Sequence, residues 1–116
     1  MIGDTSVTSK EIKGVRERVG LSQEQLAQLL GTSWVSISRW EREVSKPSAH
    51  AEARLRRLEE LLDHIGNALP RREMPRFLQT PQPLLRGYKP IELLESAYAF
   101  EDLLAFVDAA KSGDMA

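Results

Sequence analysis

Few residues in this chain have the types and spacing that catalysis or metal binding requires. Glu60, Asp63 and His64 fall within a single helical turn, where they would suit acid–base chemistry or part of a metal site. No further ligand or nucleophile stands beside them, so a solvated helical face is the expected role, and His50 is expected to be exposed. The chain has no cysteine and no glycine-rich phosphate loop. We therefore expect no enzyme activity, no cofactor and no metal.

The size and composition indicate a small globular protein. With 116 residues and a hydrophobic fraction of 41%, the chain can form one domain or two small units that share a core. No apolar run approaches the roughly 18 residues that a membrane helix needs. The first ten residues also lack the basic-then-apolar layout of a signal peptide. We therefore expect a cytoplasmic protein without a membrane partner.

Charge is distributed unevenly along the chain, although the net charge is only −1. Residues 1–72 carry 12 basic and 10 acidic groups, a net of +2, whereas residues 90–116 carry six acidic groups against one lysine, a net of −5. This division can reflect two different partners for the two regions, or simply solvated helical faces.

The elements that position these residues all have helical patterns. Apolar residues recur three and four apart in three short segments, at Ile12, Val15 and Val19, at Leu26, Ala27, Leu29 and Leu30, and at Val35, Ile37 and Trp40. Candidate N-caps precede the segments: Thr8 or Ser9, then Ser22 with Gln25 as a capping box, then Thr32 or Ser33. Gly20 and Gly31 are the expected helix stops. No strand pattern is present, so the predicted fold class is all-α.

A longer helix is predicted from Pro47 to Leu69. Its apolar residues follow a 3-4-3-4 spacing, which is a short heptad seam: Leu55, Leu58, Leu62, Ile65 and Leu69. Two heptads are marginal alone, so the seam either packs inside the monomer or forms a dimer interface. Gly66 weakens the last turn, and Pro70 is expected to end the helix.

The C-terminal region is divided by prolines. Residues 70–90 contain five of the six prolines, which predicts short helical turns rather than one long element. Pro90 suits the first position of a helix that carries Ile91 and Leu94. A final amphipathic helix is expected from Phe100 to Ala110, followed by a free tail from Lys111 to Ala116.

The first short segments have the features of a helix-turn-helix. Gly31-Thr32-Ser33 joins two helices, and Ala27 stands where such helices cross closely. Ile37 is expected to pack the second of these helices against the first, which leaves the outer face of the second helix free for DNA. The segment LSQEQLAQLLGTSWVSISRWEREVSKPS resembles the Cro/C1-type (Xre) helix-turn-helix, and the resemblance covers about residues 8–60. One departure is Glu43, where the family usually has glycine.

This resemblance implies a DNA-binding role for a defined set of residues. Gln23 would hold a phosphate, and Arg42 and Lys46 would lie against the DNA backbone. Arg39 is the candidate for guanine readout, because its guanidinium can bond O6 and N7 together. The full set is Gln23, Ser33, Trp34, Val35, Ser38, Arg39, Arg42 and Lys46, whereas Trp40 is expected in the core and Val35 suits either role. A single helix-turn-helix reads few base pairs, so we expect a homodimer on double-stranded operator DNA, with the seam or the C-terminal helices as its interface.

Residues 70–113 resemble a second module, the toxin-binding domain of the Xre/MbcA/ParS-type antitoxins. The matching features are an aromatic before Thr80-Pro81, the Leu84-Leu85 pair, Lys89-Pro90 followed by Leu93-Leu94, and the final helix. The resemblance implies an antitoxin that binds a RES-domain toxin, which consumes NAD+, and that represses its own operon. It also implies a DNA-binding domain over residues 1–69 and a small helical toxin-binding domain over residues 70–116.

The end of the chain is the expected toxin-binding surface. The expected toxin-binding residues are Glu101, Asp102, Leu104, Asp108, Lys111 and Asp114. The carboxylates among them would meet the cationic cleft that admits NAD+ and obstruct cofactor entry. The alternative is that this helix only completes the protein's own core. The alternative for the whole chain is a stand-alone repressor whose C-terminal half serves dimerisation or ligand sensing. An adaptor without DNA binding is disfavoured because Arg39, Arg42 and Lys46 are retained.

Overall fold

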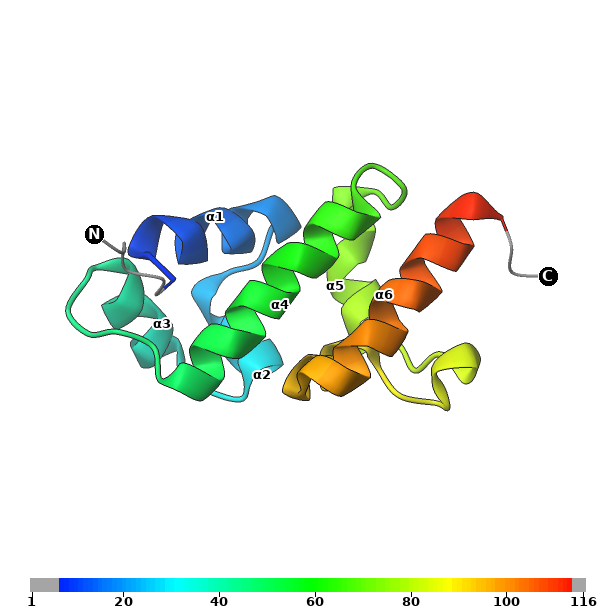
Figure 1. The fold of residues 1–116 in the computed structure, drawn as a ribbon. Helices are drawn as coiled ribbons and strands as arrows, with labels where there is room; N and C mark the ends of the chain where they lie inside the picture. Colours follow the sequence, from blue (N-terminus) through cyan, green and yellow to red (C-terminus); the bar gives the residue numbers. More distant parts are fainter. Residues whose placement is uncertain (1–6, 114–116) are drawn as a thin grey trace, which may run out of the picture. The chain divides into compact units, whose positions relative to one another are not determined.

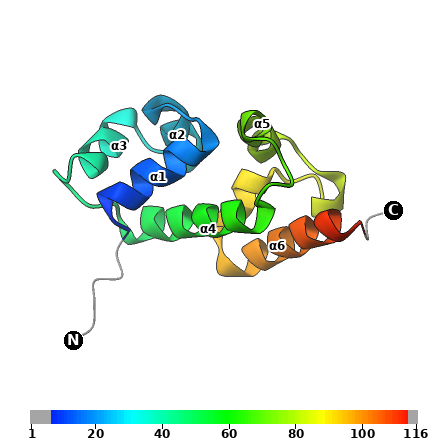
Figure 2. The ribbon, with the colours of Figure 1, turned by 90° about the horizontal axis from the view of Figure 1, so that it is seen from above.

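The protein is described by a computed structural model that covers residues 7–113, and every regular element in that range is helical. In chain order the elements are α1 (Ser9–Val19), α2 (Gln23–Leu30), α3 (Trp34–Glu41), α4 (Ala49–Ile65), η1 (Arg71–Glu73), α5 (Met74–Gln79), η2 (Pro83–Leu85), η3 (Pro90–Glu95) and α6 (Ala97–Ser112), where η marks a 3₁₀ helix. Figure 1 and Figure 2 show these elements in two perpendicular views. This architecture confirms the predicted all-α class. None of the described helices is long and apolar enough to cross a membrane.

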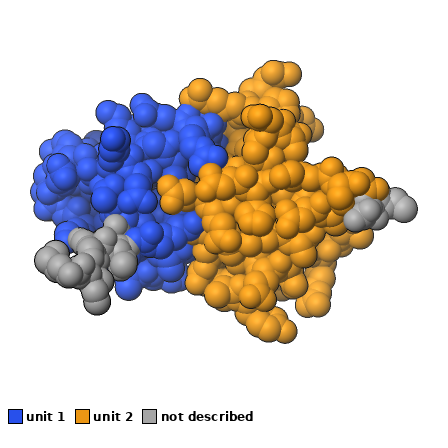
Figure 3. Space-filling view, turned by 45° about the horizontal axis from the view of Figure 1, so that its top comes forward, with its two compact units in different colours: residues 1–56 blue, residues 57–116 orange. Residues whose placement is uncertain are grey.

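The chain divides into two compact units, Met1–Arg56 and Arg57–Ala116, which Figure 3 draws in different colours. The division falls inside α4, so the first part of this helix packs with α1–α3 and the rest packs with the C-terminal elements. The sequence placed a functional boundary at 69/70, at the start of the proline-rich region. The assignment of DNA binding to residues 1–69 and of toxin binding to residues 70–116 stays a prediction.

Local capping determines where the first three helices begin and end. Thr8, Ser22 and Ser33 are the N-caps, and each side chain accepts a hydrogen bond from the backbone N–H three residues later. Ser22 and Gln25 form the predicted capping box. Gly31 ends α2 in the left-handed conformation, with φ at 68°, so that the chain can turn directly into α3.

The helix-turn-helix unit closes around a small apolar core. Ile12 of α1, Leu26 of α2 and Ile37 of α3 are fully buried, and Trp40 is nearly so. Ile37 therefore holds α3 against the other two helices, as the sequence predicted. The buried face of α3 is fixed by these contacts, so its opposite face is directed to solvent.

A buried arginine holds the first part of α4 against α2. The Arg54 guanidinium donates to the backbone oxygens of Leu30, at 2.7 Å, and Leu29, at 3.2 Å. These carbonyls lie at the C-terminal end of α2, where the helix leaves oxygens without an intrahelical partner. A cation is also favoured there by the helix dipole. Arg54 thus supports the turn that precedes α3.

The long helix is shorter than the sequence predicted. It begins after Ser48, whose hydroxyl accepts from the Ala51 N–H at 3.1 Å, and it ends at Ile65 because Gly66 adopts a positive φ of 55°. The expected ending at Pro70 is therefore wrong. Four of the five seam side chains are buried within the monomer, namely Leu55, Leu58, Leu62 and Ile65. The seam is consequently not available as the dimer interface that the sequence also allowed.

The second unit has its own core, built by α5, η3 and α6 around the end of α4. Leu78, Leu94 and Leu103 are fully buried, and the Arg57 guanidinium donates to the Leu94 carbonyl at 2.8 Å. α6 is longer than predicted at both ends, since it begins after the Ser96 N-cap and continues to Ser112. The free tail expected from Lys111 is therefore wrong for Lys111 and Ser112, which are helical; residues 114–116 lie outside the described range.

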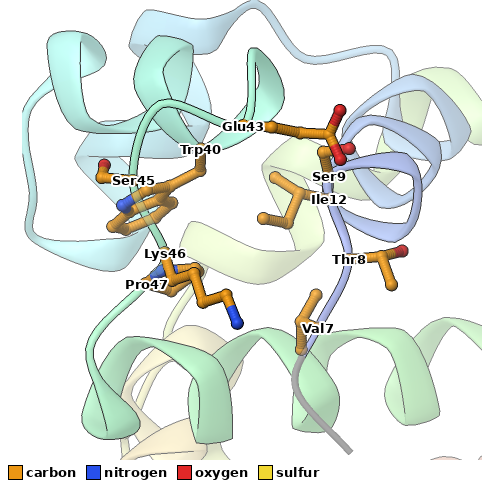
Figure 4. Close-up of a pocket in the computed structure, with 9 residues that line it drawn as sticks. All are labelled: Val7, Thr8, Ser9, Ile12, Trp40, Glu43, Ser45, Lys46 and Pro47. Carbon is orange, nitrogen blue, oxygen red and sulfur yellow. The ribbon is translucent and has the colours of Figure 1, made fainter. Parts of the chain in front are cut away.

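Glu43 follows α3 with a φ of 63°, the left-handed region that favours glycine. It borders a cavity of about 190 Å³ in the first unit, where Figure 4 shows Trp40 and Lys46 on one side and Val7 and Ile12 on the other. The departure from the family pattern is thus accommodated by backbone strain rather than by a different turn.

Replacing Glu43 by glycine should raise the free energy of unfolding by about 0.5–1 kcal/mol, because the strain of a left-handed glutamate exceeds the entropy that glycine adds to the unfolded chain. Chemical denaturation followed by circular dichroism measures this. Gln28→Gly, at an exposed site beyond the first turn of α2, is the matched control and should lower stability by about 1 kcal/mol. A loss of stability in both variants would contradict the strain at Glu43.

Candidate DNA-binding and partner-binding surfaces

The outward face of α3 carries the residues that the sequence proposed for base contact. Trp34 and Val35 are 52% and 44% exposed, and Arg39 is exposed one turn further along. Ile37 and Trp40 point the opposite way into the core. The fold therefore brings Trp34, Val35 and Arg39 together on one solvent-facing surface of α3.

The polar residues of this region also make contacts within the chain. The Ser33 hydroxyl accepts from the Ser36 N–H at 3.2 Å, so Ser33 caps α3. Arg42 donates from Nε to the Ser38 hydroxyl at 3.2 Å on the same outward face. Lys46 is exposed in the loop after α3, beside the cavity of Figure 4.

Gln23 is held differently from the expectation that its side chain binds phosphate. Its amide donates to Glu41 at 3.2 Å, and Glu41 is also bound by Arg16 in a two-pronged pair at 2.7 and 2.9 Å. The Gln23 side chain is thus directed to the end of α3. Its backbone N–H, in the first turn of α2, still lies where a phosphate can be bound.

This network changes the ionisation of its members. Burial alone acts to raise the pKa of Glu41, but the hydrogen bonds from Arg16 and Gln23 and the charge of Arg16 outweigh it, so the pKa lies below its ordinary value. The hydrogen bond with Glu41 likewise raises the pKa of Arg16. The network joins α1, α2 and α3 and fixes the C-terminal end of α3.

A lowered pKa of Glu41 predicts a loss of stability in acid. As the pH falls, the Glu41 carboxyl of the unfolded chain takes up a proton at about pH 4.3, before that of the folded protein does. The ionised Glu41 therefore stabilises the fold fully above that pH, and this stabilisation declines as the pH falls towards the pKa of the folded protein. Glu41→Gln should cost about 2 kcal/mol at pH 7 and less at pH 3, which lies below the pKa of the unfolded carboxyl. Thermal melts across this range measure the difference. Glu24→Gln is the control, and an equal cost for Glu41→Gln at both pH values would contradict the prediction.

The expected toxin-binding residues fall into three groups. Glu101 and Asp102 are exposed on α6, and Leu104 is half-buried. Asp108 and Lys111 instead contact the end of α4: Asp108 lies 3.1 Å from His64 Nδ1, and Lys111 donates to the His64 carbonyl oxygen. Asp114 lies outside the described residues. The structure therefore brings Glu101 and Asp102 together as an outward acidic pair.

Some large apolar side chains of the second unit are exposed and were not among the predicted toxin-binding residues. Tyr98 is 85% exposed on α6, and Leu84 and Tyr88 are 67% and 50% exposed around η2. On α6, Phe100 and Leu103 face the core, and Tyr98 lies on a different side of the helix. The helical periodicity of the sequence could therefore have predicted that Tyr98 is exposed. In the part of the chain that the structure describes, no three His, Asp or Glu side chains converge to hold a metal ion.

Comparison with known proteins finds one family model over the first half of the chain and relatives over most of its length. Residues 12–65 match the helix-turn-helix family model. The mycobacterial cidal antitoxins MbcA of Mycobacterium tuberculosis H37Rv and of Mycobacterium bovis are each 28% identical over 108 residues, which cover 93% of this chain and 95% of the relative. The crystal structure of the M. tuberculosis MbcT–MbcA toxin–antitoxin complex contains a similar chain, with a TM-score of 0.77, 27% identity, and coverage of 93% of this chain and 96% of that one.

Proposed function

This chain is a helix-turn-helix protein related to the antitoxin MbcA over most of its length, and from that premise we propose that it neutralises a toxin and represses its own operon. The observation that carries the proposal is that the similarity runs through both compact units rather than the DNA-binding unit alone. A binding protein of the cytoplasm, rather than an enzyme, is the role that these features support.

The proposed toxin is a RES-domain protein that consumes NAD+. The pyrophosphate of NAD+ is anionic, so the cleft that admits it needs cationic or hydrogen-bond-donating groups. Glu101 and Asp102 offer exposed carboxylates on α6, and Tyr98 on the same helix offers a large exposed ring. This surface would cover the cleft and block cofactor entry. Asp108 and Lys111 would support it by holding α6 to the end of α4.

The proposed DNA site is the outward face of α3. Arg39 would read a guanine, Arg42 and Lys46 would lie along the phosphates, and the backbone at Gln23 would bind one phosphate through the first turn of α2. The assignment gives DNA binding to residues 1–69 and toxin binding to residues 70–116.

Dimerisation would bring two copies of α3 to successive major grooves. The expected half-site spacing is about 34 Å or a multiple of it. Since the seam of α4 is buried within the monomer, the C-terminal helices remain as the expected interface. Light scattering at the concentrations used for DNA binding should give a dimer, and a monomer that still binds operator DNA tightly would contradict this assembly.

Co-expression tests the antitoxin role. The tagged chain should capture the product of the neighbouring gene, and the pair should migrate as one species on gel filtration. The full chain with Glu101→Lys and Asp102→Lys, which changes only exposed residues of α6, is the matched control and should capture far less. A full chain that binds its promoter but does not capture that product would be a stand-alone repressor instead.

A further inference from the structure

The outward face of α3 changes its chemistry along the helix. Its first turn presents Trp34 and Val35, both largely apolar and about half exposed. Its second turn presents Ser38 and Arg39, followed by Arg42 at the end of the helix. The apolar pair is therefore separated from the cationic groups by one helical turn.

Neither apolar side chain belongs to the buried core of the first unit. Ile37 and Trp40 fill the opposite side of α3 and are buried, whereas Trp34 and Val35 begin the helix and face solvent. Exposed apolar groups of this size are unfavourable in water, so their position at the start of α3 points to a contact with a partner.

In a helix-turn-helix, the first residues of the recognition helix are those that reach base edges. Val35 has no hydrogen-bonding group in its side chain, so it cannot recognise the nitrogen and oxygen atoms that distinguish most bases. The apolar feature of the major groove is the 5-methyl group of thymine, which is contacted by apolar side chains.

We propose that Trp34 and Val35 bind a thymine methyl group and so specify one A·T base pair in each half-site. The inference rests on the proposed DNA-binding function and adds the identity of a base to it. Arg39, one turn further along the same face, is then placed to read a neighbouring base pair. The thymine contact sets specificity by burial of a methyl group, whereas Arg39 acts by hydrogen bonds.

The test uses a duplex selected by the full-length chain from a random-sequence pool. Each thymine of one half-site is replaced in turn by deoxyuridine, which lacks only the methyl group. One replacement should weaken binding about fourfold, the value for one buried methyl group. Titrations by fluorescence anisotropy at fixed salt measure this ratio.

Two variants assign the effect to its residues. The double variant Trp34→Ser, Val35→Ser should bind the thymine and deoxyuridine duplexes equally. Arg39→Ala should weaken binding to both duplexes and leave their ratio unchanged. Circular dichroism melts confirm that the variants fold, as the exposure of all three side chains leads us to expect.

The outcomes separate this inference from the function on which it rests. A wild-type chain that binds its selected duplex but responds to no deoxyuridine replacement overturns the thymine contact and leaves DNA binding in place. A ratio that persists in the double variant assigns the methyl contact to other residues and also overturns the inference. A chain that selects no sequence overturns both the thymine contact and the proposed DNA-binding role.

Discussion

Reversing the acidic pair on α6, with Glu101→Lys and Asp102→Lys, should weaken toxin binding by about 100-fold or more. The two carboxylates are exposed, so their replacement leaves the core of the second unit intact. The proposed cleft is cationic because it admits NAD+, and the new lysines would bring like charges together at a cost of several kcal/mol, roughly. Cells that carry this variant with the toxin should lose protection.

Titration calorimetry with the purified toxin measures this change directly. The matched control is Glu17→Lys with Glu24→Lys, which alters the net charge equally but on exposed residues of the first unit. The control should bind the toxin as the wild type does. Equal weakening in both double variants would assign the effect to overall charge, and no weakening in the α6 variant would remove the acidic pair from the interface.

Replacing Arg39 by alanine should cost about 1–3 kcal/mol of operator binding and relax the preference at one base pair per half-site. Arg39 is exposed on the outward face of α3, where its guanidinium is free of the core and can form two bonds to one guanine. Gel-shift titration of the selected operator and of single-base variants measures both effects.

Lys46→Ala is the contrasting variant. Lys46 is proposed to contact phosphate, so its loss should weaken binding to all sequences alike and flatten the dependence of affinity on salt. If Arg39→Ala left operator affinity unchanged, the assignment of α3 as the recognition helix would be wrong. If Arg39→Ala behaved like Lys46→Ala, Arg39 would be a backbone contact rather than a base contact.

The parts of the fold that sequence predicted well depend on local interactions. Ser22 with Gln25, and the glycine stops Gly20 and Gly31, act within one turn of the chain, so their pattern suffices. The burial of Ile37 followed from helical periodicity. Glu43 stands out in the sequence because glycine is usual there, and its positive φ has the same local origin.

The parts that sequence did not predict depend on contacts between distant residues. Gln23 binds Glu41 across 18 positions, and Asp108 lies beside His64 across 44. Neither pair has a sequence signal, because the partners meet only when separate helices pack. The same limit explains why Lys111, expected in a free tail, instead bonds to the end of α4. Side-chain roles on the surface were therefore less predictable than the helices that carry them.

Growth of cells that express the neighbouring gene, with and without this chain, tests the antitoxin role most directly. The neighbouring product alone should arrest growth and deplete NAD+, and co-expression of the full chain should restore both. The full chain with Glu101→Lys and Asp102→Lys should give much weaker protection. Continued arrest and NAD+ loss in the presence of the full chain would contradict the antitoxin role.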